Sequence, residues 1–511
     1  MLARVTTYAI DGIESRRVTV EVDLRQGLPA FSIVGLGDKA VRESRERVRA
    51  AVLNSGFEFP QRRITANLAP AYLRKAGPGF DLAIAIGILA ASAQLPVQAL
   101  ERWAVFGELS LGGELRPCGG TLAVAEGTAR DGLHGLIVPA DRGAEAALVE
   151  EIRVAGLRSV ADVVELLRGG EEPARPDAGM PLHPGARFSA ADPGVLDLSD
   201  VRGHGDVVRG LTIAAAGAHN ILFSGPPGTG KTMLARRVPS ILPPLGHDEA
   251  LEVRRIHSVA GLSPGSGLVA VRPFRAPHHT ISASGLVGGG ATPVPGEVSL
   301  AHHGVLFLDE LSEFTRPALE ALRQPLEDGR VAIVRAQRTA IYPTRFMLVA
   351  ATNPCPCGFA GTRRCRCTEG DHAKHRRRLS GPLLDRIDLV LNVHPPSADE
   401  LSGGRGATTS AEVRDRVVDA RERQAHRLGP GGTNAAMTVA ELREHATPDV
   451  AGERLLRRAY ETGHVSARGH HRVLRVARTI ADIAGHDEIT AADVSLALGY
   501  RQDGPAERRV A

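Results

Sequence analysis

The pattern of apolar and polar residues in the first third of the chain predicts a mixed α/β unit. Residues 18–22 alternate between apolar and polar side chains, as in a strand with one buried face. Residues 39–54 carry apolar side chains at helical spacing, which is typical of an amphipathic helix. The apolar run 82–95 is about 14 residues long, too short to cross a bilayer, and predicts a buried helix. We expect residues 1–168 to form one domain.

The middle of the chain has short apolar runs that do not alternate with polar residues. Such runs are typical of parallel strands that are covered on both faces. Three of them are residues 221–224, 305–308 and 347–351. They lie within residues 197–396, where strand-like and helix-like segments alternate. We therefore expect a second α/β domain there, built on a parallel sheet.

Two stretches rich in small and polar residues flank this second domain. Residues 169–196 show no periodic apolar pattern and predict a linker, and residues 397–410 predict another flexible stretch. Beyond them, apolar residues recur at helical spacing, interrupted by Gly and Pro at 429–432. Residues 411–511 are therefore expected to form a helical domain.

Composition narrows the classes of protein to which the chain can belong. Of its 511 residues, 43% are hydrophobic and 23% are charged, which excludes a wholly disordered or fibrous chain. The 62 basic and 58 acidic residues give a net charge of +4, which is compatible with a nucleic-acid partner but is no proof of one. The first residues lack the charged and apolar regions of a signal peptide, so we expect a cytoplasmic location.

The strongest chemical signal is a glycine-rich segment that matches the phosphate-binding pattern G-x-x-x-x-G-K-[ST] in full. The segment reads Gly225, Pro226, Pro227, Gly228, Thr229, Gly230, Lys231, Thr232. An apolar strand precedes it and a helix-like segment follows it, the context in which backbone N–H groups surround phosphate oxygens. We expect Lys231 to reach the β- and γ-phosphates and Thr232 to bind Mg²⁺, so ATP and Mg²⁺ are the predicted ligands.

Two carboxylates and an amide follow later strands of the same domain. Asp309 and Glu310 end one of the three apolar runs, and Asn353 comes just after another. We expect Asp309 to hold Mg²⁺, Glu310 to polarise the attacking water and Asn353 to orient that water. The simpler alternatives are an acidic helix cap for the two carboxylates and an ordinary turn residue for Asn353.

Four of the five cysteines form two close pairs, Cys355 with Cys357 and Cys365 with Cys367. Four thiolates can hold Zn²⁺ tetrahedrally in a loop that has no core of its own, so we expect a zinc site. C-x-C is a less usual chelate than C-x-x-C, and free thiols or a redox switch remain as alternatives. The histidine pairs at 278–279 and 302–303 are expected to serve local hydrogen bonding and packing rather than metal binding.

Two basic stretches are candidates for contact with DNA. Arg335 and Arg338 lie between apparent strands at 331–334 and 340–342, at the tip of a predicted hairpin. The other stretch comprises residues 372–378. Because aromatic residues are few nearby, phosphate contacts should dominate over base stacking. The alternative for both stretches is a solvated charged turn.

Longer motifs resemble those of one protein family. They comprise residues 35–44, 276–280, 288–290, 295–304, 353–358, 379–388 and 466–474. Together with the nucleotide motifs they closely resemble the magnesium-chelatase-like AAA+ ATPases of the YifB/ComM type, over nearly the whole chain. The resemblance implies an AAA+ P-loop core with a parallel sheet, a helical C-terminal lid and a Lon-protease-like N-terminal domain.

The same resemblance implies a function and two further site residues. It implies a ring-forming, hexameric ATPase that acts on single-stranded or branched DNA, as a branch-migration helicase in recombination or natural transformation. Arg386 matches the arginine finger, which reaches the γ-phosphate of a neighbouring subunit, and Arg468 matches the lid arginine called sensor 2. The hairpin that carries Arg335 and Arg338 matches one that lines the ring pore. The alternative is a chelatase-like or chaperone-like regulatory ATPase that remodels a protein partner.

The N-terminal domain lacks the residues that a Lon-type protease uses. Lon proteases need a Ser in a Gly-Pro-Ser-Ala-Gly turn and a Lys after a Gly-Gly pair. Here the turn at 77–81 contains no Ser, and the pair Gly119-Gly120 is followed by Thr121. Neither a nucleophile nor an activating base remains. We expect a non-proteolytic domain that serves as a docking or DNA-facing module.

Overall fold

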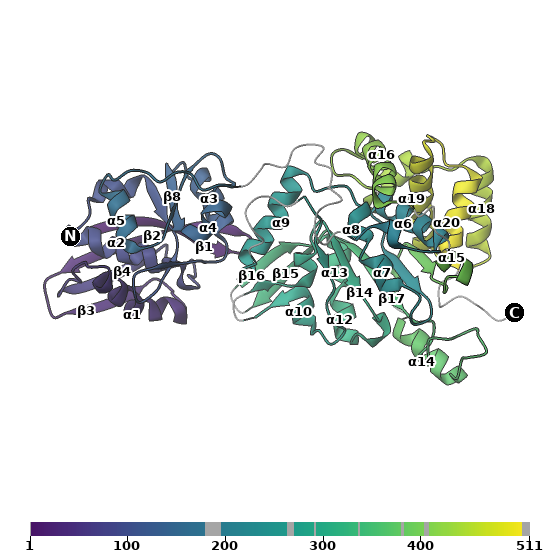
Figure 1. Ribbon diagram of the computed structural model, residues 1–511, viewed down its shortest axis with the longest axis horizontal. Coiled ribbons are helices and arrows are strands. Elements are labelled where there is room, and N and C mark those ends of the chain that lie inside the picture. The colour runs from purple at the N-terminus through teal and green to yellow at the C-terminus, as the bar shows by residue number, and fades with distance from the viewer. Residues whose placement is uncertain are drawn as a thin grey trace.

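The structure is a computed structural model that describes residues 2–178, 196–262, 270–290, 293–335, 338–379, 383–402 and 408–502. The molecule is elongated, with one sheet at the N-terminal end, a second sheet in the middle and a helical unit at the far end (Figure 1). Within these ranges we find no helix that combines the length and the apolar character needed to cross a membrane.

A mixed sheet with the strand order β3-β4-β2-β1-β5-β8-β9 forms the N-terminal part. Its strands are β1 (Leu2–Asp11), β2 (Glu14–Arg25), β3 (Ala30–Val34), β4 (Arg63–Ala69), β5 (Trp103–Val105), β8 (Gly135–Pro139) and β9 (Arg153–Leu157). β2 is antiparallel to its neighbours β1 and β4, whereas β8 is parallel to its neighbours β5 and β9. The predicted alternation is confirmed, because Val18, Val20 and Val22 of β2 are all fully buried.

Helices cover this sheet and share its core with the strands. They are α1 (Lys39–Asn54), α2 (Asp81–Ala91), α3 (Thr121–Arg130), α4 (Ala140–Ala146) and α5 (Val160–Leu167), with the short strands β6 (Glu108–Leu109) and β7 (Leu115–Arg116) between them. α1 has the predicted bounds. α2 is buried throughout but ends at Ala91 instead of Leu95. The chain turns there because Ala93 adopts a left-handed conformation, with a φ of 62°.

The predicted linker begins with residues that pack on the N-terminal sheet. Arg175 donates hydrogen bonds to the carbonyl oxygens of Ile152, Ala147 and Val149 over 2.8–2.9 Å. Residues 179–195 of that linker lie outside the described residues. The division of the chain at residues 168 and 196 therefore stays a prediction.

The middle sheet is parallel, as the apolar runs predicted, with the order β11-β14-β17-β10-β18. Its strands are β10 (Ile221–Ser224), β11 (Phe274–Arg275), β14 (Val305–Leu308), β17 (Met347–Thr352) and β18 (Leu389–Asn392). Alternate residues face two different cores: Phe223 and Val349 belong to one cluster, whereas Leu222 and Leu348 belong to the other. Both faces are apolar for this reason, and the runs do not alternate.

Helices and two small hairpins surround the middle sheet. The helices are α6 (Gly205–Gly217), α7 (Lys231–Ala235), α8 (Val238–Ile241), α9 (His247–Val259), α10 (Ala283–Val287), α11 (Glu297–Leu300), α12 (Arg316–Ala321), α13 (Arg323–Asp328) and α14 (Glu369–Leu379). The hairpins are β12 (Gly288–Gly289) with β13 (Val294–Pro295), and β15 (Arg330–Arg335) with β16 (Arg338–Pro343). The second hairpin confirms the strands expected around 331–334 and 340–342.

The C-terminal part is helical, as predicted. It comprises α15 (Ala398–Ser402), α16 (Ser410–Leu428), α17 (Val439–His445), α18 (Val450–Glu461), α19 (Ala467–Ala484) and α20 (Ala491–Gln502). α16 ends at Leu428, and Gly429, which follows it, lies within the predicted break. Val417 of α16 and Val473 of α19 share a buried cluster with Phe223 of β10, so the helical unit packs on one face of the sheet.

Candidate nucleotide-binding site

The glycine-rich segment lies at the edge of the middle sheet where the parallel strands end. It follows β10 directly, and α7 begins at Lys231. Gly225 lies so close to the neighbouring chain that a Cβ atom there would be 2.2 Å from the Val393 carbonyl oxygen. Only glycine fits this approach, which explains why the segment opens on one.

Lys231 is held inside this loop by oxygen atoms. Its Nζ donates to the carbonyl oxygens of Gly225 (2.6 Å) and Pro226 (2.8 Å) and to Oδ1 of Asn353 (3.1 Å). The side chain is only 9% exposed, and burial lowers its pKa against the opposing effect of Asp309 and Glu310. Neutral oxygens compensate this buried ammonium weakly, so the loop offers a cation ready for an anionic ligand.

The carboxylates lie where the sequence predicted, directly after β14. Oδ2 of Asp309 accepts a hydrogen bond from the Thr232 hydroxyl at 2.7 Å, which brings together the two predicted Mg²⁺ ligands. Oδ1 of Asp309 accepts the backbone N–H of Glu310 at 2.9 Å. Glu310 itself has a φ of 51°, a left-handed conformation that is uncommon for a residue other than glycine and recurs at functional sites.

Asn353 connects the loop to the cysteine-rich segment. Its side chain accepts from Lys231, and its backbone oxygen accepts from the buried His375 of α14 at 2.9 Å. Five residues later, a Cβ atom on Gly358 would be 2.5 Å from Cδ of Pro227. The cysteine-rich segment therefore packs directly against the glycine-rich loop.

The four clustered cysteines converge on one point. Cys355 Sγ lies 3.3 Å from Cys357 Sγ and 3.9 Å from Cys365 Sγ, and Cys357 and Cys365 are 3.7 Å apart. With Cys367, all four sulfur atoms lie within 4.8 Å of one another. A tetrahedral zinc site with bonds of about 2.3 Å requires sulfur atoms about 3.8 Å apart. The donor set and its spacing fit Zn²⁺.

Arg386 and Arg468 lie at the opposite edge of the same sheet. Arg386 precedes β18, and the four paired residues of β10 and β18 separate it from the glycine-rich loop by roughly 13 Å of strand. Its guanidinium forms an ion pair with Glu327, and Arg468 lies 3.6 Å from Asp385. The structure therefore brings the two arginines together, but away from Lys231.

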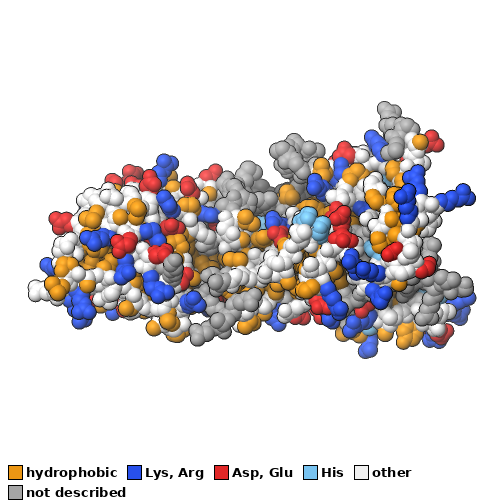
Figure 2. Space-filling model, turned by 90° about the horizontal axis from the view of Figure 1, so that it is seen from below, with side chains coloured by type: hydrophobic (Ala, Val, Ile, Leu, Met, Phe, Trp, Pro, Cys, Tyr) orange, Lys and Arg blue, Asp and Glu red, His pale blue; other side chains and the backbone are white. Residues whose placement is uncertain are grey.

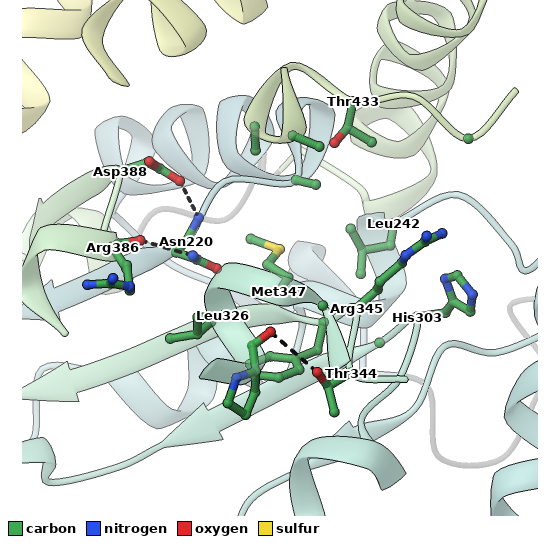
Figure 3. A pocket seen from close by; sticks show the side chains of 18 of the residues that line it. Asn220, Leu242, His303, Leu326, Thr344, Arg345, Met347, Arg386, Asp388 and Thr433 are labelled. Atoms are coloured by element: carbon green, nitrogen blue, oxygen red, sulfur yellow. Dashed lines mark hydrogen bonds between the residues drawn. The ribbon is translucent and has the colours of Figure 1, made fainter. Parts of the chain in front are cut away.

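A cavity of about 880 Å³ opens beside these arginines and is lined in part by Arg386, Arg468 and Arg472. Figure 3 shows Asn220 between Arg386 and Asp388. The amide of Asn220 donates to the backbone oxygen of Arg386 at 2.9 Å, and its backbone N–H donates to Asp388 at 3.0 Å. Asn220 thus fixes the backbone that carries Arg386, a role that no sequence motif had indicated.

The histidine pair at 302–303 forms a hydrogen-bonded cluster with Glu252. Nδ1 of His302 accepts the backbone N–H of Arg345 at 3.0 Å, so the neutral ring carries its proton on Nε2 and donates to Glu252 at 2.9 Å. Burial lowers the pKa of His302 to about 4, and the hydrogen bond from His302 lowers the pKa of Glu252 to about 2. The local hydrogen bonding that the sequence predicted for this pair is therefore present.

The other histidine pair includes a contact that sequence reasoning missed. Nδ1 of His279 lies 3.3 Å from Oε2 of Glu310. The two residues are about 30 positions apart in sequence, and only the pairing of β11 with β14 brings them together. The signal in the sequence was the motif at 276–280, which had indicated a family resemblance and no role for a particular side chain.

The two basic stretches that the sequence predicted to contact DNA lie in a hairpin and in a helix. Arg335 and Arg338 are backbone partners in the strand register at the end of the β15–β16 hairpin, and their side chains lie outside the described part of the structure. Within the other basic stretch, described side chains of α14 such as Arg377 and Arg378 are exposed. Basic and acidic side chains are interspersed over the face drawn in Figure 2. Among the described side chains of this face, basic residues therefore form no broad surface free of acidic ones.

Comparison with known proteins places these features in a family. Residues 197–401 match the family model described as magnesium chelatase, subunit ChlI; residues 407–501 match its C-terminal part, and residues 20–142 match subunit ChlI of Mg-chelatase. The competence protein ComM of Haemophilus influenzae is 43% identical over 509 residues, which cover 98% of this chain and 97% of that protein.

Two further relatives define the extent of the similarity. The uncharacterized protein YifB of Escherichia coli is 42% identical over 501 residues, covering 98% of this chain and 97% of that protein. Lon protease 2 of Bacillus subtilis is 28% identical over 204 residues, or 33% of this chain and 35% of that protein. With a parallel P-loop sheet, a helical C-terminal part and a Lon-like similarity, the chain belongs to the YifB/ComM-type family of magnesium-chelatase-like AAA+ ATPases.

Proposed function

We propose that the chain is a ring-forming, ATP-hydrolysing DNA motor, a branch-migration helicase that acts in recombination or natural transformation. One observation carries the motor part of this proposal. The groups that would surround the phosphates of ATP lie at one edge of the middle sheet, whereas two arginines lie together at the opposite edge. Such a division suits a ring in which each ATP lies between two subunits.

Each residue of the glycine-loop edge has a distinct chemical role in this proposal. The backbone N–H groups of Gly228, Thr229 and Gly230 and the ammonium of Lys231 bind the phosphate oxygens, and Thr232 and Asp309 hold Mg²⁺. Glu310 polarises the attacking water while Asn353 orients it. Mg²⁺ supplies charge neutralisation on the phosphate oxygens when it is bound.

The two arginines at the opposite edge act on the nucleotide of a neighbouring subunit. Arg386 and Arg468 are too far from the chain's own Lys231 to stabilise charge on the same nucleotide, because a whole strand separates them. Both arginines would reach a neighbouring subunit's γ-phosphate, where such a group typically contributes about 10³–10⁵ in rate. This requirement supports a homo-oligomeric ring, which we propose to be a hexamer.

DNA is the proposed partner because one full-length relative is a competence protein. Contact would come from Arg335 and Arg338 at the hairpin tip, through phosphates rather than bases. Replacing both with Ala should weaken binding to all sequences alike and reduce the salt slope by about 2. The measurement is DNA affinity at several salt concentrations, and an unchanged affinity and slope would exclude the hairpin as the contact.

Zinc is the second proposed cofactor, bound by Cys355, Cys357, Cys365 and Cys367. The support is the spacing of their sulfur atoms, which is close to the edges of a zinc–thiolate tetrahedron. Metal analysis of protein purified without chelator should find about one zinc per chain. Four freely alkylated thiols and no bound zinc in the native protein would refute the site.

A chelatase-like or chaperone-like ATPase that remodels a protein partner is the alternative, because the matching family models are described as magnesium chelatase. The two functions differ in their response to DNA. We expect single-stranded or branched DNA to raise the ATPase rate of the oligomer. An ATPase rate that is unchanged by single-stranded, duplex and branched DNA would favour the alternative.

A further inference from the structure

We propose that the N-terminal domain supports the β15–β16 hairpin and so holds it in position for DNA binding. The inference rests on the proposed function for the identity of the DNA partner. Two contacts between the N-terminal domain and the middle part carry it. The turn between β1 and β2 reaches the hairpin, and α3 packs on α9.

The hairpin depends on what packs against it. β15 and β16 form a sheet of their own, and a sheet of two strands is only marginally stable by itself. One face of the hairpin, which includes Ile333 and Tyr342, is buried in an apolar cluster. On the other face, Val334 and Ile341 are 64% and 51% exposed. The buried face is therefore the one that holds the hairpin in place.

The N-terminal domain reaches the hairpin through the turn between β1 and β2. This turn joins the paired ends of the two strands and consists of Gly12 and Ile13. Ile13 is partly buried and packs against the apolar cluster that contains Ile333 and Tyr342. A Cβ atom on Gly12 would lie 3.4 Å from the Ile341 carbonyl oxygen. The turn therefore contacts both the cluster under the hairpin and the backbone of β16.

A second contact fixes the N-terminal domain on the middle part. The backbone N–H of Gly120, which precedes α3, donates to the carbonyl oxygen of Ser258 at 3.0 Å and to its hydroxyl oxygen at 3.1 Å. A Cβ atom on Gly119 would lie only 3.0 Å from the same carbonyl oxygen. Arg255 of α9 forms an ion pair with Glu126 of α3 at 2.7 Å. Two contacts on different elements define the orientation of the domain.

α9 connects the N-terminal domain with the cluster that holds the hairpin. Leu251 of α9 packs against a cluster of the N-terminal domain that contains Leu122 and Val124 of α3. Val259, the last residue of α9, packs against the cluster under the hairpin. Figure 1 shows β15 and β16 on the side of the middle part that faces the N-terminal sheet. A displacement of the N-terminal domain therefore changes the support of the hairpin.

Two sets of variants test the two contacts. Ile13→Ser removes the apolar side chain from the turn, whereas Ile13→Val retains an apolar one. Ile33→Ser is the matched control, because Ile33 is also partly buried but packs on a cluster of the N-terminal domain itself. At the second contact, Glu126→Arg places two like charges together. Adding Arg255→Glu restores an opposite pair with reversed polarity.

The experiment measures amide hydrogen exchange of the full-length protein and its affinity for a branched DNA probe. We expect Ile13→Ser to speed exchange in β15 and β16 by about tenfold and to weaken DNA binding by about 3–10-fold, because a less supported strand pair opens more often. Ile13→Val and Ile33→Ser should keep the hairpin exchange and the DNA affinity of the parent protein. Glu126→Arg should change both quantities by about 2–3-fold in the same direction, since partly exposed ion pairs contribute little, and the double variant should reverse this change.

Three results would overturn the inference. One is an Ile13→Ser variant whose hairpin exchanges as in the parent protein. Another is an equally large change in Ile33→Ser, which would show a general loss of stability in the domain. The third is faster exchange of the hairpin without any loss of DNA affinity. If the parent protein binds no DNA, the proposed DNA function fails, while the exchange of the hairpin still decides whether the N-terminal domain supports it.

Discussion

The two edges of the middle sheet differ in how their functional groups are assembled. At the glycine-loop edge, the contiguous residues 225–232 form the phosphate site that we propose, and nearby oxygens surround its lysine. At the opposite edge, Arg386 and Arg468 come from separate parts of the chain and meet beside a cavity of about 880 Å³. The first edge carries, in one chain, most of the groups to which we assign nucleotide binding. The second edge carries the two arginines to which we assign a catalytic role in a neighbouring subunit.

The largest expected effect tests whether the arginine edge serves another subunit. Arg386→Ala should still bind ATP, because Lys231 and its loop remain, yet hydrolysis should fall by about 10³-fold or more. The measurements are nucleotide affinity and kcat of the purified oligomer. A variant that loses binding and hydrolysis together would place Arg386 in the chain's own binding site.

A mixing experiment sharpens this comparison of the two edges. Arg386→Ala subunits carry an intact glycine loop, and Lys231→Ala subunits carry an intact arginine edge. Where subunits exchange, mixed rings should recover part of the activity that neither variant has alone. No recovery despite verified co-assembly would mean that the arginine acts within its own subunit or has no catalytic role.

The next prediction separates binding from catalysis within the glycine-loop edge. Lys231→Ala should abolish tight nucleotide binding, because the buried charge facing the phosphates is lost. Glu310→Gln should bind ATP normally but hydrolyse it about 10²–10⁴-fold more slowly, because an amide cannot take a proton from water. Equilibrium binding of a fluorescent ATP analogue distinguishes the two. Equal loss of binding in both variants would remove Glu310 from the catalytic role.

The same contrast shows what the sequence could and could not predict. The glycine loop and the three main strands were predictable because each is a local pattern, and both faces of those strands are buried by separate clusters. The early end of α2 was not, because Ala93 breaks the helix although its apolar pattern continues. The contacts of Asn220 with Arg386, and of His279 with Glu310, depend on strand pairing between distant segments.

The smallest effect concerns the support that the cysteine-rich segment gives to the glycine loop. Gly358 has a φ of 85°, and a Cβ atom there would be 2.5 Å from Cδ and 2.8 Å from Cγ of Pro227. Gly361 has a similar φ of 78° in the same segment, but a Cβ atom there would have no neighbour within 4 Å. Alanine at either position therefore brings the same left-handed strain of about 1–2 kcal/mol. Only Gly358→Ala also pushes against the loop.

This pair of glycines allows the strain and the contact to be measured separately. Gly358→Ala should weaken ATP binding by about tenfold, equivalent to about 1.4 kcal/mol, because Pro227 must move from the position that shapes the phosphate loop. Gly361→Ala should bind ATP as the parent does, and both variants should keep the zinc content of the parent protein. Titration with an ATP analogue measures the affinity for ATP. Metal analysis of the same samples measures the zinc content. If both variants bind ATP equally well, contact with Pro227 does not support the loop, and the cysteine-rich segment is a neighbour of the nucleotide site without influence on it.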